Sequence, residues 1–549
     1  MRSKLFLLAV FGLLQAAWAG AAEIWVGAGP SCTTASLGEA IASARTSVEP
    51  DTIRIATDQP YEDQSVRIDT SVELIGGYGS CGAEDRSGYT PLFGTGTMAV
   101  VTIDGGSSGA GIDVRLDRLD VSGGGADARN VDSGGLSIRG AARVRLSDSI
   151  IHHNDASLVE RASSGRGGGV ALNGALASLV IERAVDIHDN TASGGAGLSV
   201  VGGRVRILPH GVTIRHNLAL DGGGGVLILD RGSVIVRTDP KAPELPVDGV
   251  VISHNRAGGS GGGILLGGPD AELLADQLVV QGNHAQTLGS ALYVGYQGKA
   301  SLARSAEPGA RDCPPELQCL RLSDNGPNNT VHVTDGGSLL LDGVVVRESV
   351  NEHSLISVGA HRSRLRITGS LVSNSAPTSC YYHLVGMWGG TFEFEHSTFV
   401  RSAPACVWTP LVHAYGADLD GTHVIGRSSL VSGYQKIFRP PSNSPDYSEH
   451  YDCVLKDRGD PEPAAERSEV APIQFVDMAG ADFRLTADNL AIDYCDDSAP
   501  SSRQADLDRQ PRGEDSATHA NRYGTYDLGA YEFGGNPDRI FANGFEARF

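Results

Sequence analysis

Apolar and polar residues alternate over short stretches along most of the chain, and this alternation predicts β-strands rather than helices. The pattern is clearest in six segments, residues 52–55, 66–68, 72–75, 338–341, 365–367 and 391–394. Because every second side chain of a strand points to the same face, each segment would bury one apolar face. The pattern therefore predicts an all-β protein built from many short strands.

One segment near the N-terminus departs from this alternation and predicts a short helix. Ser36 is suited to be its N-cap, and Glu39 stands three residues later, as in a capping box. The apolar residues of the segment share one helical face: Leu37, Ala40, Ile41 and Ala44. A helix just before a run of strands would cover the exposed edge of the first strand layer.

An internal repeat begins at about residue 110. Each copy contains a β-branched pair, polar residues, an asparagine, a small residue, a glycine run and another apolar strand. The repeat asparagines are Asn154, Asn190, Asn217, Asn255 and Asn283, which lie 36, 27, 38 and 28 residues apart. Such periods indicate a solenoid, and the absence of helical periodicity makes it an all-β solenoid.

The expected fold is a right-handed parallel β-helix with a short N-terminal helical cap. Strand interiors are β-branched or aliphatic, as strands buried in parallel sheets require. Each repeat asparagine is expected at a fixed turn in the left-handed conformation, with its amide bonded to the asparagine of the next coil. The glycine runs would permit a tight bend.

We expect five segments along the chain: a signal peptide at 1–19, an N-terminal cap at 20–60, the β-helix at 61–440, irregular strands that close the solenoid at 441–533, and a tail at 534–549. Three stretches inside them, residues 238–248, 303–320 and 437–470, are rich in proline, cysteine or charge. These stretches are expected to be loops that leave the stack.

The first residues have the pattern of a cleaved export signal. Arg2 and Lys4 precede an apolar stretch that ends at residue 18, and residues 17–19 read Ala-Trp-Ala. No later stretch is long and apolar enough for a membrane helix. We therefore expect a protein that is secreted or displayed on the outer cell surface, without a transmembrane segment after cleavage.

The chain contains eight cysteines: Cys32, Cys81, Cys313, Cys319, Cys380, Cys406, Cys453 and Cys495. An even count in an exported protein indicates disulfides. Pairing in sequence order (32–81, 313–319, 380–406 and 453–495) closes the shortest loops and is favoured. Metal binding is disfavoured, because no cysteine or histidine cluster has zinc-ligand spacing.

Charge and composition narrow the choice of partner. The formal net charge of −21 argues against nucleic acid or an anionic membrane as a partner. The 72 glycines and an aromatic content of 6% suit a fold of short strands and tight turns. The protein is expected to be a monomer. Glycans or cell-surface proteins are the expected partners, and no cofactor is expected.

The asparagine and glycine-run repeat resembles the repeats of polymorphic outer-membrane-protein-type β-helices, with Ile or Val where that family has Phe. Residues 36–41 are similar to the CSLREAI-type opening of secreted bacterial β-helix proteins, although Gly38 replaces the usual Arg. Residues 475–477, 482–485, 491–493 and 527–532 resemble the C-terminal part of the same group. The resemblance implies a Gram-negative, secreted or surface-exposed protein with a pectin-lyase-like fold, and it implies no catalytic site.

Histidines beside the repeat asparagines are the first candidates for chemistry. His153, His216 and His254 each precede the asparagine, and His188 lies one place earlier. In stacked coils these side chains could form a strip that holds a metal ion or handles protons. Solvated turn residues are the favoured interpretation, because the irregular spacing does not require the ligands to converge.

Carboxylate pairs are the second candidates, since a glycosidase needs two carboxyl groups and a lyase needs a base beside carboxylates that bind calcium. The pairs considered are Asp186 with Asp189, Asp221 with Asp230, and Asp418 with Asp420. None lies in a motif of such enzymes, so surface carboxylates are favoured and no catalytic residue is assigned.

The leading hypothesis is a non-enzymatic protein for adhesion or for binding glycans or proteins. The alternative is a polysaccharide lyase or glycoside hydrolase, with calcium as a cofactor only in the lyase case. A groove on one β-face where Asp, Arg and aromatic side chains converge would favour the enzyme, because the fold itself hosts both functions.

Overall fold

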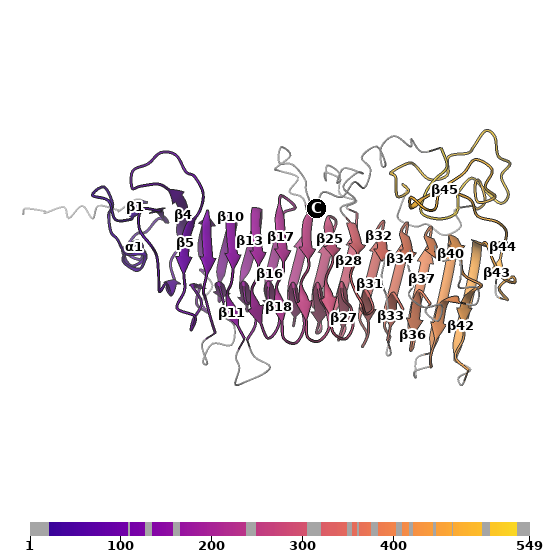
Figure 1. Ribbon diagram of the computed structural model, residues 1–549, viewed down its shortest axis with the longest axis horizontal. Helices are drawn as coiled ribbons and strands as arrows, with labels where there is room; N and C mark the ends of the chain where they lie inside the picture. Colours follow the sequence, from indigo (N-terminus) through magenta and orange to yellow (C-terminus); the bar gives the residue numbers. More distant parts are fainter. Residues whose placement is uncertain are drawn as a thin grey trace, which may run out of the picture.

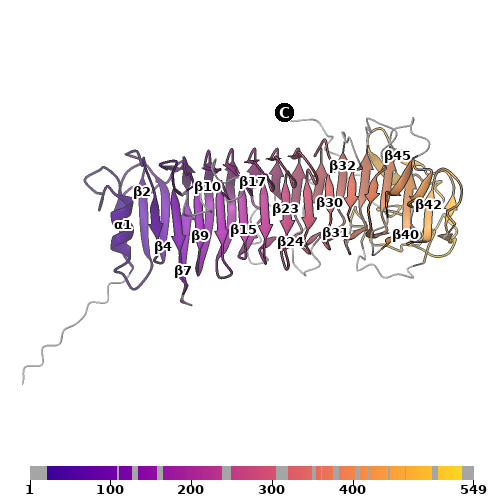
Figure 2. The ribbon, with the colours of Figure 1, turned by 90° about the horizontal axis from the view of Figure 1, so that it is seen from below.

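The computed structural model describes residues 21–107, 110–126, 134–157, 165–237, 249–304, 320–348, 354–359, 362–374, 383–401, 409–416, 421–442, 446–463, 465–496 and 505–534. These residues form a parallel β-helix, as the sequence predicts. Figure 1 shows the coils stacked side by side along one long axis, with helix α1 (Leu37–Ala44) at the N-terminal end. Three long sides run along this axis, and Figure 2 shows the same stack after a quarter turn.

The first side pairs, in spatial order, β1 (Glu23–Val26), β2 (Asp51–Ala56), β4 (Val72–Tyr78), β7 (Ile112–Asp117), β10 (Ala142–His152), β13 (Ser178–His188), β16 (Arg204–Ile207), β20 (Ser233–Val236), β24 (Glu272–Ala275), β28 (Lys299–Ala303), β31 (Ser338–Asp342), β34 (Arg364–Thr368), β37 (Gly390–Glu395), β40 (Thr422–Ser432), β42 (Tyr447–Lys456) and β43 (Ala465–Glu466). The long strands β10, β13, β40 and β42 continue around the corner into the second side.

The second side adds β5 (Thr90–Phe93), β8 (Leu119–Ser122), β17 (Val212–Arg215), β21 (Val250–Ser253), β25 (Leu278–Gln281), β29 (Leu320–Ser323), β32 (Val345–Glu348), β35 (Leu371–Asn374), β38 (Thr398–Arg401) and β44 (Glu469–Val470). A short corner sheet follows it, made of β11 (Asp155–Ala156), β14 (Thr191–Ala192), β18 (Leu218–Ala219), β22 (Arg256–Ala257) and β26 (His284–Ala285).

The third side is a 13-stranded sheet. Its strands are β3 (Val66–Ile68), β6 (Val101–Asp104), β9 (Leu136–Arg139), β12 (Val170–Asn173), β15 (Leu198–Val201), β19 (Val226–Leu229), β23 (Ile264–Gly267), β27 (Leu292–Gly295), β30 (Val331–Val333), β33 (Ile356–Val358), β36 (Val385–Met387), β39 (Pro410–Ala414) and β41 (Lys436–Arg439). Two further strands, β45 (Phe475–Asp477) and β46 (Asp482–Leu485), pair antiparallel outside the stack.

Inward side chains of all three sides form one continuous core. In β16, for example, Val205 and Ile207 are buried, and both pair in register with aliphatic residues of the coils before and after. Burying one such side chain contributes about 1.5–3 kcal/mol. Since each coil repeats the same inward positions, the core extends from Ile24 to Val454.

Helix α1 covers the N-terminal end of this core, as predicted. Its N-cap Ser36 accepts a hydrogen bond from the backbone N–H of Glu39, and the four apolar residues of the predicted face, Leu37, Ala40, Ile41 and Ala44, are all buried. The Glu39 carboxylate accepts a hydrogen bond from the hydroxyl of Thr34. The capping box is therefore only half formed, because Glu39 does not turn back to the N-cap backbone.

The repeat asparagines form the predicted ladder along the corner between the second side and the corner sheet. The Asn217 Nδ2 atom donates to Oδ1 of Asn255 at 2.9 Å, and Asn217 Oδ1 accepts from both the backbone N and the side-chain Nδ2 of Asn190. The same bonds link Asn154, Asn190, Asn217, Asn255 and Asn283 in order. The ladder continues to Asn325, which the repeat pattern had not included.

The expected backbone conformation of these asparagines was wrong. The left-handed residue is the one before each asparagine, as in His153 (φ 51°), His216 (φ 54°) and His254 (φ 55°). Because the asparagine side chain must point inward along the stack to reach the next coil, the preceding residue makes the turn and its own side chain points to solvent.

Glycines of the runs are required at two positions. The glycine two places before the last glycine of the run has a positive φ, as in Gly195 (φ 60°). The last glycine leaves no room for a side chain: a Cβ atom on Gly197 would lie 2.6 Å from the carbonyl oxygen of Gly225 and 3.0 Å from Nδ2 of Asn217. The glycine run therefore allows the chain to pass closely over the asparagine ladder.

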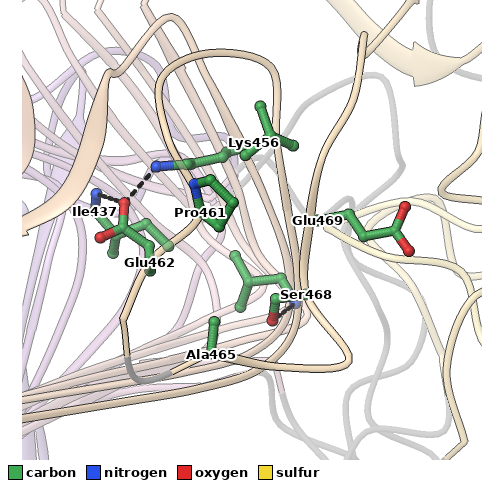
Figure 3. Close-up of a pocket in the computed structure, with 9 residues that line it drawn as sticks. Ile437, Lys456, Pro461, Glu462, Ala465, Ser468 and Glu469 are labelled. Carbon is green, nitrogen blue, oxygen red and sulfur yellow. Dashed lines mark hydrogen bonds and ion pairs between the residues drawn. The ribbon is translucent and has the colours of Figure 1, made fainter.

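The stack is longer than predicted at its C-terminal end. Residues 437–470 were expected to leave the solenoid, and its end was placed at residue 440. Instead, β42 pairs with β40 over nine residues in two stretches, and β43 and β44 pair with β42. The buried Lys456 amine contacts the Glu462 carboxylate at 2.5 Å (Figure 3), beside a pocket of about 10 Å³ that has room for no more than a water molecule.

Residues 441–533 were expected to close the solenoid end, and the described residues from 471 onward correct this expectation. They fold back along the second side and pack on β32, β35, β38 and β40, as the position of β45 in Figure 1 shows. Outward apolar residues of these strands, Val345, Leu371 and Leu430, form one buried cluster with residues such as Leu528 and Ala530. The segment is drawn there because these outward positions are apolar and need cover.

Two of the four predicted disulfides lie within the described residues, and both are present. Cys32 is bonded to Cys81, and Cys453 to Cys495. Cys313, Cys319, Cys380 and Cys406 lie outside the described residues, as do the signal peptide and the tail from residue 535. Within the described part of the chain, no helix is long and apolar enough to cross a membrane.

Candidate functional site

Five histidines gather along the asparagine corner in four consecutive coils. They are His152, His153, His188, His216 and His254. The rings of His152 and His188 stack with centroids 5.1 Å apart, and those of His216 and His254 stack at 5.2 Å. The four histidines singled out in the sequence therefore do lie along one edge, and His152 joins them.

Two of these imidazoles are held by carboxylates rather than aimed at a common point. His152 Nε2 lies 2.7 Å from Asp120 Oδ1, and His188 Nδ1 lies 2.7 Å from Asp189 Oδ2. Burial raises the pKa of Asp189, but the hydrogen bond from His188 and the electrostatic interactions with His188, His153 and His216 together outweigh it and leave the pKa below the usual range. The arrangement is a set of histidine–carboxylate hydrogen bonds along a partly solvated edge.

A three-ligand metal cluster is not formed by this edge among the residues that the structure describes. Elsewhere in the described residues, the potential ligand atoms of Cys32, Asp58 and Cys81 lie within 4.8 Å of one another. Since the two sulfur atoms of that group are joined in a disulfide, they cannot act as thiolate ligands.

The carboxylate pairs suggested by the sequence have structural partners or lie apart. Asp186 accepts hydrogen bonds from Arg215 Nη2 at 2.7 Å and from the Thr213 hydroxyl at 2.6 Å. Asp221 and Asp230 are exposed in two different turns, one on each side of β19. Asp418 and Asp420 lie outside the described residues.

A cluster of aromatic rings on the third side was not predicted. It consists of His383, Trp388, His413 and Tyr415, here called the aromatic wall. Trp388 and Tyr415 follow β36 and β39, two neighbouring strands, and their rings stack with centroids 4.6 Å apart and planes 21° apart. Both stay open to solvent, with 45% of Trp388 and 49% of Tyr415 exposed.

Hydrogen bonding and packing fix the orientation of this wall. The Tyr415 hydroxyl lies 2.8 Å from His383 Nε2, and the rings of His383 and His413 stack at 4.9 Å. Gly386 of β36 has no side chain, which leaves room for these rings. A Cβ atom there would lie 3.3 Å from both the His383 and the Tyr415 rings. The exposed rings are therefore held in place before any ligand arrives.

The imidazoles of the wall are uncharged at neutral pH. Burial, and to a smaller extent the nearby His413, Arg401 and Arg439, lower the pKa of His383 to about 3. Burial and Arg439 also lower the pKa of His413. The four rings of the wall thus carry no charge of their own, and the exposed guanidinium of Arg439 lies beside them, in register with His413.

A smaller aromatic group lies on the same side, nearer the middle of the solenoid. Tyr293 of β27 stacks on His332 of β30 at 5.2 Å, and Tyr296 beside them is 60% exposed. Burial lowers the pKa of His332 to about 4. The third side therefore carries two groups of neutral rings, separated by strands with small outward residues.

The groove expected of an enzyme, with acids, arginines and aromatics together, is divided in the structure. Arg115, Arg143 and Arg145 line a hollow with acidic side chains on the first side, whereas the stacked exposed rings lie on the third side. The sequence contained one signal of the wall: Trp388, one of four tryptophans, stands 27 residues before Tyr415, the spacing that separates Asn190 from Asn217. A scan against protein-family models finds no match to this chain, and a search of curated proteins finds none either.

Proposed function

We propose that the protein is an extracellular glycan-binding protein and that the aromatic wall is its binding site. The observation that carries this proposal is the stacked pair of Trp388 and Tyr415, which is rigid but nearly half exposed. A cluster of exposed apolar rings on a protein surface marks a candidate recognition site. Trp and Tyr combine a broad apolar face with a polar group and lose little conformational entropy on binding.

Pyranose rings suit this surface because their C–H faces pack on aromatic rings while their hydroxyls reach polar neighbours. Since the wall carries no formal charge at neutral pH, the sugar at this point is expected to be neutral. The pKa of about 3 for His383 also means that this imidazole stays uncharged at mildly acidic pH. Its contact with the Tyr415 hydroxyl is therefore expected to be the same at pH 5 and pH 8.

Secretion through the cleaved signal at residues 1–19 belongs to the same proposal. The two disulfides of the described residues support it, because such bonds persist in oxidising compartments outside the cytosol. The identity of the glycan, and not the fold, determines whether the protein binds a host surface or the cell's own envelope.

The test uses the secreted chain, residues 20–549, with a panel of neutral oligosaccharides and isothermal titration calorimetry. Trp388→Ala is expected to weaken binding by about 30-fold, as removal of a central aromatic contact does. Tyr89→Ala, which removes a tyrosine 40% exposed near the other end of the solenoid, is the matched control and should bind normally. A panel without any ligand, or equal loss in both variants, would contradict the proposal.

The competing proposal, a polysaccharide lyase or glycoside hydrolase, is tested on the same panel with and without calcium. New reducing ends would indicate bond cleavage, and ultraviolet absorbance from unsaturated products would indicate a lyase. Either product would replace the binding function with an enzymatic one.

A further inference from the structure

The last coil of the solenoid carries a buried lysine at a position where the preceding coils have apolar residues. Lys456 of β42 pairs in register with Val431 of β40, and Val431 pairs in turn with Phe399 of β38. All three residues are buried, and Lys456 is only 2% exposed. The other two lysines within the described residues, Lys299 and Lys436, are exposed. Lys456 is therefore unusual, since an amine at the end of the core is costly to bury as a charge.

A carboxylate faces this amine. The Lys456 Nζ atom lies 2.5 Å from Oε1 of Glu462, whose side chain is 6% exposed, and Figure 3 shows the two groups directed toward each other. Backbone groups hold both partners. The amine donates to the carbonyl oxygen of Gln435 at 3.0 Å, and the N–H of Ile437 donates to Glu462 Oε1 at 2.7 Å. The amine and the carboxyl group are thus fixed in contact, as a reaction between them requires.

The surroundings of the pair are largely apolar. The pocket beside it has a volume of about 10 Å³, and its lining includes Ile437, Val454, Pro461, Ala465 and Val470. Two opposite charges are costly in such surroundings even when they are paired. Transfer of one proton from the ammonium to the carboxylate gives an uncharged amine and a carboxylic acid, the form that an apolar enclosure favours. An uncharged lysine amine is a nucleophile.

We propose that Lys456 and Glu462 condense to form an isopeptide bond. The amine nitrogen attacks the carboxyl carbon of Glu462, one carbon–oxygen bond breaks, and the oxygen leaves as water with two of the three ammonium protons. No further reactant is consumed, because the ammonium and the carboxylate together contain all the atoms of the amide and the water. The reaction removes two buried charges, and the fixed contact gives the amine a high effective concentration at the carboxyl group.

This bond locks the C-terminal end of the stack. Pro461 and Ala465 line the same pocket as Ile437 and Val454, which belong to the last coil of the core. The segment after β42 therefore covers the end of the core, as terminal elements of solenoids do. An amide between Lys456 and Glu462 ties this segment to β42 covalently.

The experiment measures the mass of purified residues 20–549 after reduction of the disulfides. The protein is expected to be lighter than its sequence by one water molecule. Lys456→Met keeps the length of the side chain without an amine, and Glu462→Leu removes the carboxyl group; each variant should have the full mass of its own sequence. The matched control, Lys299→Met, removes an exposed lysine and should still lack one water molecule.

Tryptic peptides then locate the bond. Because trypsin does not cleave after an acylated lysine, residues 437–458 should appear joined to residues 459–467 in one branched species. In Lys456→Met the same two peptides should separate. Full sequence mass of the folded parent protein, or loss of the water in any other peptide, overturns the proposal. The parent protein alone gives both results, so the test does not depend on the folding of a variant.

Discussion

Single residues of the repeat are specified by the coil above as much as by their own strand. Asn217 shows this most clearly. It is buried, and its side chain bonds the main-chain oxygens of Ile187 and Arg215, as well as the asparagines of both neighbouring coils. Buried amides of this kind are costly to leave unpaired. An asparagine is therefore expected at the equivalent position of each coil as long as the next coil also carries one.

Replacing Asn217 with alanine is expected to lower the free energy of unfolding by on the order of 3 kcal/mol, because it leaves the buried backbone N–H of Asn190 and the amide of Asn255 short of partners. Urea unfolding monitored by circular dichroism measures the change. Asn521→Ala, at an exposed position outside the stack, is the control and should stay within about 0.5 kcal/mol of the parent. Equal effects of the two substitutions would mean that the ladder contributes no stability.

Much of this residue-level structure could be predicted from the sequence, and the failures have physical causes. The ladder was visible because its asparagines recur at repeat spacing. The left-handed conformation was assigned to the wrong residue. The pattern shows that the asparagine recurs, but it does not show which residue adopts the left-handed conformation. Trp388 and Tyr415 were missed because neither belongs to a recurring sequence pattern. Only the register of β36 with β39 brings them together.

At the scale of elements, strands of the stack were predictable and the C-terminal segment was not. A strand in the stack repeats its neighbour's pattern, so its location follows from local alternation. The segment from residue 471 is held by contacts distant in sequence: the Ala530 N–H donates to the Thr398 hydroxyl, and the Gly529 N–H to the carbonyl of Ser428. Periodicity carries no information about such contacts.

Acidic groups buried in this C-terminal segment make its docking dependent on pH. Burial and the charge of Asp527 raise the pKa of Glu532 from 4.5 to about 8, although Arg512 opposes the shift; burial and Asp506 raise the pKa of Asp508 to about 7. Because these groups hold their protons more tightly when folded, their contribution is fully present below the unfolded pKa of about 4.5. It is lost as the pH rises through 7 to 8.

The segment is therefore expected to be better protected at pH 5.5 than at pH 8.5. Hydrogen exchange of residues 505–534, corrected for the intrinsic rates at each pH, measures this protection. Glu532→Gln should reduce the pH dependence, because the amide cannot ionise. Stronger protection at pH 8.5 would show that the ion pair with Arg512 outweighs burial.

Within the stack each coil pairs with its two neighbours, and only the C-terminal segment described above spans several coils, from β32 to β40. Away from that segment, stability is therefore local along the axis. In solenoids of this kind the terminal elements protect the coils beneath them. Helix α1 has this function at the N-terminus, where it packs on β1, β2 and β3. The Cys32–Cys81 disulfide ties the segment just before the helix to the chain just after β4.

Removing the contact of this cap should unfold the solenoid progressively from one end. Leu37→Asp with Ile41→Asp places two charges against the buried end of the core, and we expect loss of hydrogen-exchange protection in β1 to β4 that fades along the axis and leaves β28 to β42 unchanged. The control, Ala42→Asp with Ser43→Asp, adds the same charge on the exposed face of the helix. Uniform loss along all coils would mean that the stack unfolds as one unit, because only long-range cooperativity carries a defect at the first coil to the last.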